Sequence, residues 1–309
     1  MKIYLPLNSW GLMLILFSGI SGMANYGVAE ETNNPSNSNS AEFYYNLGTN
    51  HYAAGEWSQA IEDFTKYIHL NGTNALAYAG RGCCYFAKGD LDKAISDFTQ
   101  QIQMDPTNVV ACLNRGNAHR AKMEFDLALI DYNKCLQLDP TNLQALGGRA
   151  TVYNHRHEYE KSVSDLNQAI QINPNYDPIW VMRGCAHSHN NQYVWAADDF
   201  QKAIQINPKN FDAYGDLGWL RATCPLAAIR DGKEAVEMAT KACELTKWKR
   251  WEYLDTLAAA LAETGNFEKA AKYERQILEM NQISDKDRTG IHNRLSLFER
   301  QKPFRETSE

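Results

Sequence analysis

The sequence predicts an all-α protein built as a linear array of paired helices, because small and large residues recur along it at a fixed period. Glycine recurs on a spacing of 34 residues, with Ala150 in its place once; alanine follows twelve residues later, with Ser162 in its place once, and a large residue follows four residues after that. The recurring residues are Gly48, Gly82, Gly116, Gly184 and Gly218; Ala60, Ala94, Ala128 and Ala196; and Phe64, Phe98, Tyr132, Leu166 and Phe200. A regular period of this length indicates stacked repeats.

Each 34-residue unit is expected to form two amphipathic helices joined by a short polar turn, such as AKGDLD. The small residues let the two helices approach closely, and the large residue fills the space between neighbouring units. Proline marks the end of a unit at Pro106, Pro140, Pro174 and Pro208. Since one unit cannot bury its apolar face alone, the units are expected to stack into a solenoid.

These recurring positions resemble the tetratricopeptide repeat (TPR) from about residue 41 to residue 280. The resemblance implies a right-handed α-solenoid of about seven helix pairs, whose first helices line a concave inner face. The repeats are expected to start near residues 41, 75, 109, 143, 177, 211 and 251. The expected TPR solenoid therefore spans residues 41–280.

The last two repeats depart from the strict period. In the sixth repeat the small residue, Ala235, comes five positions late, which indicates an insertion around Pro225. The phrases RATCP, RDGKEAVE and LDTLAAALAE resemble a C-terminal block of bacterial repeat proteins, although Leu226 stands where an acidic residue usually follows Cys-Pro. Residues 281–309 are expected to form a capping helix and tail, since Ser284 provides a helix start and Lys302-Pro303 ends it.

The N-terminal segment predicts export. Residues 1–24 combine an early lysine, an apolar run and small residues, which is typical of a signal peptide, and residues 25–40 are expected to be a disordered linker. The protein would then be periplasmic, secreted or part of the cell envelope. The alternative is a membrane anchor formed by an uncleaved N-terminal segment, the only case in which a membrane partner is expected.

The overall charge argues against a nucleic-acid partner. The chain has 31 basic and 37 acidic residues, a net charge of −6, and no Lys/Arg run.

Arginine and aspartate also follow the period and predict a structural ladder of ion pairs. Each arginine is expected to pair with the aspartate of its own unit, of the preceding unit, or of both, because an unpaired buried charge costs several kcal/mol. The ladder consists of Asp63, Arg81, Asp97, Arg115, Asp131, Arg149, Asp165, Arg183 and Asp199. A catalytic pair would not be copied in every unit, so these residues are interpreted as structural.

The seven cysteines include no CxxC pair, and several take positions that other units fill with alanine. They are therefore expected to be packing residues. Since an exported chain meets oxidising conditions, Cys224 and Cys243 are the candidate disulfide around the inserted turn.

No catalytic, cofactor or metal site is predicted. The histidines around His155 and His189 lack a third ligand and are interpreted as turn and groove residues. No nucleophile elbow, phosphate-binding loop or HExxH motif occurs.

The resemblance assigns a peptide-binding groove to specific positions of each first helix. Applied here, it gives Tyr45, Thr49, Tyr52, Cys83, Phe86, Leu113, Asn117, Arg120, Asn154, His155, Val181, Cys185, His189 and Trp219. This face is aromatic and polar and nearly uncharged. At the fifth position of each first helix, where relatives that bind a peptide's terminal carboxylate carry lysine, this sequence has Tyr45, Ala79, Leu113, Gly147, Val181 and Gly215. An extended apolar segment or an amphipathic helix is the expected ligand.

The sequence thus predicts a non-enzymatic scaffold that binds a segment of another protein in its groove. The alternative is a structural subunit of a cell-envelope assembly, in which the edges of the repeats make the contacts.

Overall fold

The computed structural model describes residues 40–281 and 283–306, which form fifteen α-helices and no strand. The predicted signal peptide and residues 25–39 of the predicted linker lie outside the described residues. The chain divides into two compact units, with the division between Val152 and Tyr153. The expectation of an all-α repeat fold is confirmed.

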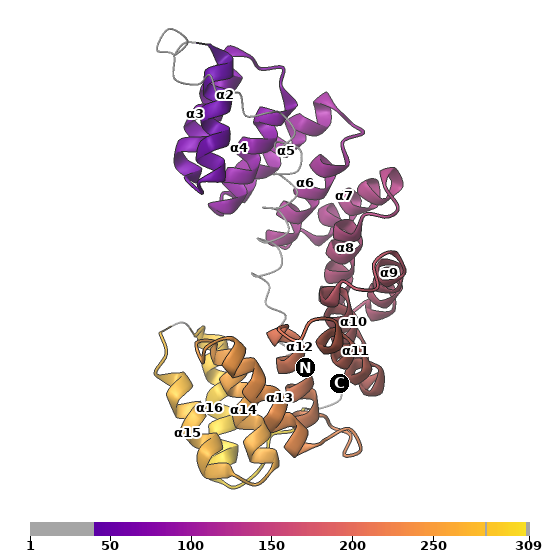
Figure 1. Cartoon of the computed structure of the whole chain (residues 1–309), viewed down its shortest axis with the longest axis vertical. Helices are drawn as coiled ribbons and strands as arrows, with labels where there is room; N and C mark the ends of the chain where they lie inside the picture. Colours follow the sequence, from indigo (N-terminus) through magenta and orange to yellow (C-terminus); the bar gives the residue numbers. More distant parts are fainter. Residues whose placement is uncertain (1–39, 282, 307–309) are drawn as a thin grey trace. The chain divides into compact units, whose positions relative to one another are not determined.

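The N-terminal unit holds three complete helix pairs and most of a further helix, α8. Its helices are α2 (Ala41–Ala53), α3 (Trp57–Leu70), α4 (Ala75–Ala87), α5 (Leu91–Met104), α6 (Val109–Ala121), α7 (Phe125–Leu138) and α8 (Leu143–His155). In Figure 1 the two helices of each complete pair run side by side, and each pair packs against the next.

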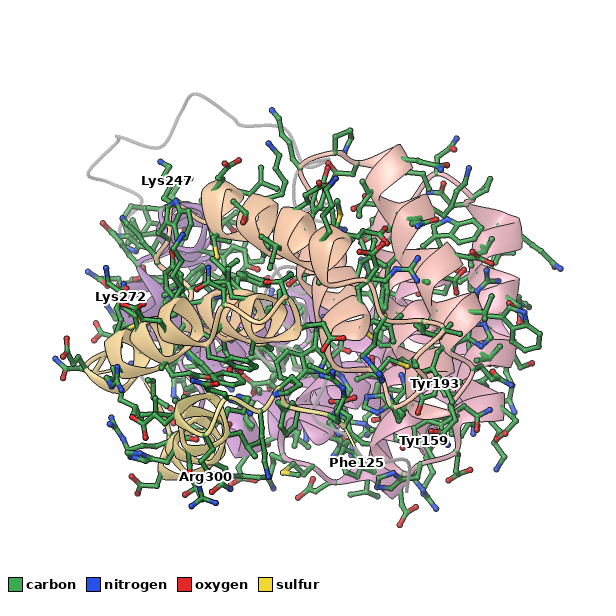
Figure 2. The ribbon with its side chains drawn as sticks, turned by 90° about the horizontal axis from the view of Figure 1, so that it is seen from below. Phe125, Tyr159, Tyr193, Lys247, Lys272 and Arg300 are labelled. Carbon is green, nitrogen blue, oxygen red and sulfur yellow. The ribbon has the colours of Figure 1, made fainter. Side chains whose placement is uncertain are left out.

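The C-terminal unit continues with the same alternation. Its helices are α9 (Tyr159–Ile172), α10 (Asp177–His189), α11 (Tyr193–Ile206), α12 (Phe211–Thr223), α13 (Gly232–Leu245), α14 (Trp251–Glu263), α15 (Phe267–Leu278) and α16 (Asp285–Glu299). Figure 2 shows the side chains of Lys247 and Lys272 at the outside of this unit, where both are exposed.

An asparagine starts several of the first helices. The side-chain oxygens of Asn74, Asn108, Asn142 and Asn210 each accept a hydrogen bond from a backbone N–H in the first turn that follows. Those N–H groups have no partner within the helix, so each asparagine stabilises its helix by about 1 kcal/mol.

In repeats one, two, three and five the core includes a close contact between the recurring glycine and the recurring aromatic residue. A Cβ atom added to Gly184 would lie 2.6 Å from Cε1 of Phe200, which is fully buried. Only a residue without a side chain fits at this contact.

The insertion in the sixth repeat forms an ordered turn between α12 and α13. Arg230 donates hydrogen bonds to the carbonyl oxygens of Cys224 and Pro225, at 2.7 and 3.1 Å. Arg221 donates to the carbonyl oxygen of Ile229 at 3.0 Å. Two arginines thus satisfy the backbone of the longer turn.

The end of α16 redirects the chain. The N–H of Lys302 donates to the carbonyl of Leu297, and Gln301 takes a left-handed backbone conformation with φ of 56°. This pair of features ends the helix, and residues 302–306 follow as a segment without regular structure.

Within the described residues, every helix is too short or too polar to cross a bilayer.

Candidate functional site

The first helices place the predicted groove residues at unequal depth. Five of the fourteen remain partly exposed: Tyr45, Thr49, Arg120, His155 and His189. Nine are buried: Tyr52, Cys83, Phe86, Leu113, Asn117, Asn154, Val181, Cys185 and Trp219. A buried side chain contacts a ligand only if its neighbours move, so the accessible part of the predicted groove is smaller than the sequence indicated.

In the N-terminal unit the accessible groove residues are supported by an aromatic cluster and a polar network. The ring of Tyr45 lies 6.0 Å from that of Phe64 and 5.3 Å from that of Tyr67, measured between centroids. The Tyr132 hydroxyl donates to Asn117 at 2.7 Å and accepts from Nε of Arg120 at 3.2 Å. Tyr45 and Arg120 are therefore held in place by side chains beneath them.

In the C-terminal unit two predicted groove residues have other partners. The imidazole of His189 stacks on the ring of Tyr159 at a centroid distance of 5.6 Å. The Cys185 thiol donates to the Asp216 carboxylate at 3.5 Å. Burial raises the pKa of Cys185, and also that of Asp216, well above the ordinary value, so both groups favour their neutral forms.

Three arginines of the ladder, Arg81, Arg115 and Arg183, pair with the aspartate of their own repeat. Nε and Nη2 of Arg81 donate to the two carboxylate oxygens of Asp97 at 2.9 and 2.8 Å. Burial raises the pKa of Asp97, and the hydrogen bonds from Arg81 counteract that rise. Two further pairs have the same two-point geometry: Arg115 with Asp131, and Arg183 with Asp199.

The contact with the preceding repeat goes to a neutral residue. Nη1 of each arginine donates to the side chain two positions after the preceding repeat's aspartate. These acceptors are Thr65 for Arg81, Thr99 for Arg115, Asn133 for Arg149 and Asn167 for Arg183. Within each unit, the ladder thus runs between repeats through hydroxyl and amide groups.

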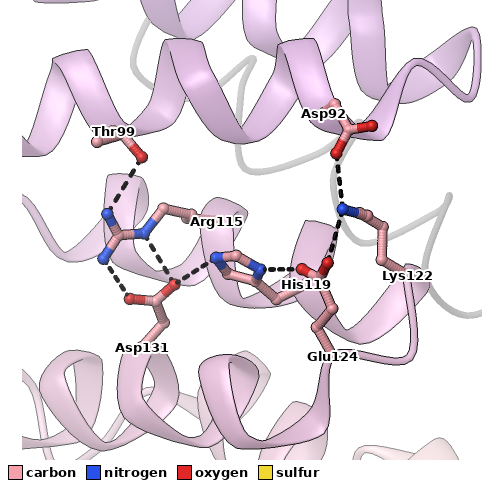
Figure 3. A network of polar contacts seen from close by, with 7 residues as sticks. All are labelled: Asp92, Thr99, Arg115, His119, Lys122, Glu124 and Asp131. Atoms are coloured by element: carbon pink, nitrogen blue, oxygen red, sulfur yellow. Dashed lines mark hydrogen bonds and ion pairs between the residues drawn. The ribbon is translucent and has the colours of Figure 1, made fainter.

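Around Arg115 the ladder extends into a larger network (Figure 3). His119 Nδ1 lies 2.7 Å from Glu124 Oε2, and its Nε2 lies 3.9 Å from Asp131 Oδ2. Lys122 bridges Glu124 and Asp92 of the preceding repeat, with Nζ at 2.6 Å from an oxygen of each. Because Lys122 connects the second and third repeats, the network is interpreted as structural.

The first repeat explains how an aspartate is satisfied without an arginine. Leu47 stands at its arginine position, and Asp63 pairs with His51, whose Nδ1 lies 2.6 Å from Oδ2. Histidine recurs at the same position as His119 and His187, which also face the aspartates of their repeats.

The last repeat contains a deeply buried charge cluster that the sequence did not predict. Arg294 of α16 donates from Nε and Nη2 to the two oxygens of Asp255, each at 2.7 Å, and its Nε lies 3.4 Å from Glu274. Asp255 and Glu274 are fully buried. Burial and the nearby Asp255 raise the pKa of Glu274 well above its ordinary value, because one arginine does not neutralise two carboxylates.

The segment after α16 covers Trp219, a predicted groove residue. The Trp219 indole N–H donates to Oε1 of Glu306 at 2.9 Å, and the Glu306 backbone N–H donates to the carbonyl of Thr223 at 3.0 Å. Phe304 lies against the indole at a centroid distance of 5.9 Å. Sequence reasoning treated these residues as a tail, and its only signal was an aromatic and an acidic residue after Lys302-Pro303.

All seven cysteines are buried free thiols, so the disulfide expected between Cys224 and Cys243 is not formed in this structure. Both lie in the same apolar cluster of the C-terminal unit. Burial raises the pKa of Cys243 to about 12, and a thiol that stays protonated reacts slowly.

In the parts of the chain that the structure describes, no three His, Cys, Asp or Glu side chains gather as metal ligands would.

The fold and the ladder define a helical-repeat protein. Family profiles described as tetratricopeptide repeat match residues 45–109, 109–142 and 178–210. Residues 45–142 and 178–210 therefore match the tetratricopeptide repeat. No curated protein matches the sequence.

Solved structures of repeat proteins are similar in fold. A tetratricopeptide repeat protein from Parabacteroides merdae is 16% identical, and the alignment covers 84% of this chain and 98% of that one, with a TM-score of 0.62. The C-terminal part of a TPR repeat-containing protein from Cytophaga hutchinsonii is 19% identical over 80% of this chain and 98% of that one, with a TM-score of 0.59. MamA from Desulfovibrio magneticus RS-1 is 16% identical over 55% and 96%, with a TM-score of 0.52. At these identities the similarity establishes the fold alone.

Proposed function

We propose that this chain is a non-enzymatic scaffold that binds an extended segment of another protein along the first helices of its repeats. One observation carries the proposal: residues 302–306 of the chain lie without regular structure against α12, through an aromatic contact, an indole hydrogen bond and a backbone hydrogen bond. A first helix of this chain thus offers an extended segment the contacts that peptide recognition uses.

The N-terminal unit offers such a surface to an external partner. Tyr45, Thr49 and Arg120 are partly exposed on the first helices, and each is fixed by contacts within its own repeat. A preformed surface loses little conformational entropy on binding, so most of the ordering cost falls on the flexible partner. The signal-peptide pattern of residues 1–24 supports an activity outside the cytoplasm, in the cell envelope or beyond it.

A second candidate function is favoured by exposed apolar residues on the second helices. Ile130 of α7 is 61% exposed and Trp195 of α11 is 57% exposed, and Leu127 and Val194 are exposed beside them. Apolar side chains on the outer helices suit a structural subunit whose repeat edges pack against other components.

Site-specific photo-crosslinking in intact cells tests the two candidates against each other. A crosslinking amino acid at Arg120 reports on the first helices, and one at Lys134, exposed on α7, is the matched control. Groove binding predicts that Arg120 captures one protein and Lys134 does not. Capture at Lys134 alone would favour the structural subunit and contradict the groove.

A binding measurement then tests the captured segment itself. A synthetic peptide of that segment is titrated against the purified chain and against the Arg120→Ala and Lys134→Ala variants. We expect Arg120→Ala to weaken binding about tenfold, the loss of a hydrogen bond from a charged group, and Lys134→Ala to leave it unchanged. Equal affinity for both variants would remove the first helices from the interface.

A further inference from the structure

Residues 302–306 occupy their position through a turn that fixes their direction. The backbone hydrogen bonds of Gln301 and Lys302 to the last turn of α16, with the left-handed Gln301, send the chain toward the first helices. Many helices end with such a turn, and here it gives residues 302–306 a defined starting direction.

Phe304 supplies the apolar contact of the segment. Its ring contacts both the Trp219 indole and the Arg294 guanidinium, and the guanidinium carbon lies 5.7 Å from the Phe304 centroid and 5.6 Å from the Trp219 centroid. Arg294 is held by Asp255 on α14. The site for the aromatic ring is thus formed by two fixed side chains, a geometry that stabilises an aromatic ligand through stacking and cation–π contact.

Glu306 supplies a buried acidic contact. The residue is only 8% exposed, and its carboxylate accepts the hydrogen bond from Trp219, which is 7% exposed. Burying a carboxylate is costly unless hydrogen bonds compensate, so the indole N–H and the surrounding groups define a subsite for an acidic side chain. Trp219 therefore contacts two residues of the segment: its ring packs against Phe304, and its indole N–H donates to Glu306.

Arg305, which lies between these two residues in the sequence, forms an ion pair of its own. Its guanidinium pairs with Glu263 at the end of α14, and Glu263 also pairs with Arg230 of the inserted turn, at 3.2 Å. The insertion that lengthens the sixth repeat thus contributes to the acidic group that receives Arg305. In three successive residues the segment presents an aromatic, a basic and an acidic side chain, and each has a partner on the last two repeats.

We propose that residues 302–306 are an intramolecular ligand of the surface around Trp219, and that an external extended segment with an aromatic residue two positions before an acidic one binds there by displacing them. The inference rests on the proposed scaffold function, and it names the partner's chemistry and a control on access. The internal segment has no helix or strand of its own, so it opens locally at less cost than the helices beneath it.

How strongly residues 302–306 occupy the surface around Trp219 sets how much they weaken the binding of an external segment. An external segment must compete with one tethered a few residues away, at an effective concentration of about millimolar. Its apparent affinity is reduced by the fraction of molecules in which the site is open. Releasing the internal segment should therefore raise the apparent affinity for an external one.

The experiment uses the full chain and its own segment as the probe. A fluorescein-labelled peptide KPFRETSE, the sequence of residues 302–309, is titrated against the unmodified chain and against Phe304→Ala/Glu306→Ala. We expect the double variant to bind at least about tenfold more tightly. The matched control peptide KPARATSE, which lacks the aromatic and the acidic side chain, should bind neither.

Nuclear magnetic resonance of the indole N–H groups locates the binding. The Trp219 signal, assigned with Trp219→Phe, should shift in the double variant and return toward its original position when KPFRETSE is added. If circular dichroism shows that the double variant loses helix, Arg305→Ala, which removes a partly exposed ion pair, takes its place with an expected gain of about threefold.

Three outcomes would overturn the inference: equal affinity for both chains, no binding by a variant that stays helical, or a dimer of the unmodified chain that the double variant abolishes. A dimer would make a second copy's segment the occupant. These outcomes are separable from failure of the scaffold function, because that function is tested at Arg120 in the N-terminal unit with a captured partner. Loss of partner binding in Arg120→Ala, together with no KPFRETSE binding, would reject this inference alone.

Discussion

The regular repeats and the last repeat both bury arginine against carboxylates, and they do so in different ways. In repeats two, three and five an arginine of the first helix pairs with one aspartate of the second helix, sixteen residues later, and part of the guanidinium stays in contact with solvent. In the last repeat Arg294 meets Asp255 and Glu274, which lie 39 and 20 residues away along the chain, and all three are buried.

The difference shows what each arrangement stabilises. A pair within one repeat holds two neighbouring helices together and depends little on other repeats. A cluster that joins α14, α15 and α16 forms only when the last helix is docked, so it couples the end of the array to its final repeat. The surface that Arg294 then presents to Phe304 exists only in that docked state.

The largest expected effect tests the cluster. Arg294→Leu should destabilise the C-terminal unit by about 3–5 kcal/mol, because two carboxylates then lie buried with no cation. Urea unfolding measures the loss, and hydrogen exchange should show it in α14–α16 and not in α2–α7. Arg300→Leu, at an exposed position just after α16, is the control, and a matching loss in it would argue against the cluster.

The second prediction tests the pairs within repeats. Arg115→Leu should cost about 2–3 kcal/mol, less than Arg294→Leu, because water still reaches the Asp131 region through the partly exposed site. Hydrogen exchange should rise in α6 and α7 while α14–α16 stay unchanged. An increase spread evenly over the chain would contradict the independence of the repeats. Lys134→Leu on the exposed side of α7 serves for comparison.

A smaller effect is expected where the helices of a regular repeat touch. Gly184→Ala should destabilise by about 1–3 kcal/mol, since the added Cβ overlaps the buried Phe200 ring. Thermal unfolding checks this value. Gly72→Ala, whose Cβ would contact only one backbone oxygen at 3.5 Å, should change the melting temperature little, and an equal shift in both variants would locate the effect elsewhere.

The smallest expected effect concerns pH. The pKa of Glu274 is raised in the folded protein, so the unfolded chain releases this proton at lower pH than the folded one. Stability is therefore highest below about pH 4.5 as far as this group is concerned, and it falls as the pH rises toward the folded pKa. Glu274→Gln should flatten that decline above about pH 4.5. Parallel stability curves for the two proteins would show that Glu274 is ionised.

The sequence predicted the all-α repeat fold well, because the 34-residue period records packing directly. Gly184 and Phe200 recur since each repeat brings the same two positions into contact. The period also located the arginines and aspartates. It left two aspartates open as the partner of each arginine, because these two aspartates occupy the same position in successive repeats. In repeats two, three and five the arginine pairs with the aspartate of its own repeat, and its contact with the preceding repeat goes to Thr99 or an equivalent residue instead of that repeat's aspartate.

The depth of the groove residues could not be predicted in the same way. A position on a helix gives the direction of a side chain, while its exposure depends on what the next repeat places over it. Leu113 and Cys185 occupy predicted groove positions, and both are buried. Phe304 and Glu306 follow no period, and they contact Trp219, which lies about 85 residues earlier in the chain. No local sequence pattern therefore predicted these contacts.

The own-repeat pairing of arginine with aspartate bears on how such an array changes length during evolution. In repeats two, three and five each module carries both charges of this pair, and its arginine takes only a hydroxyl or an amide oxygen from the preceding repeat. Duplicating or deleting one of these modules therefore leaves no member of an arginine–aspartate pair without its counterpart. Gene duplication can extend or shorten a chain of this design in whole steps, and the arginine–aspartate pairs of the remaining modules are kept.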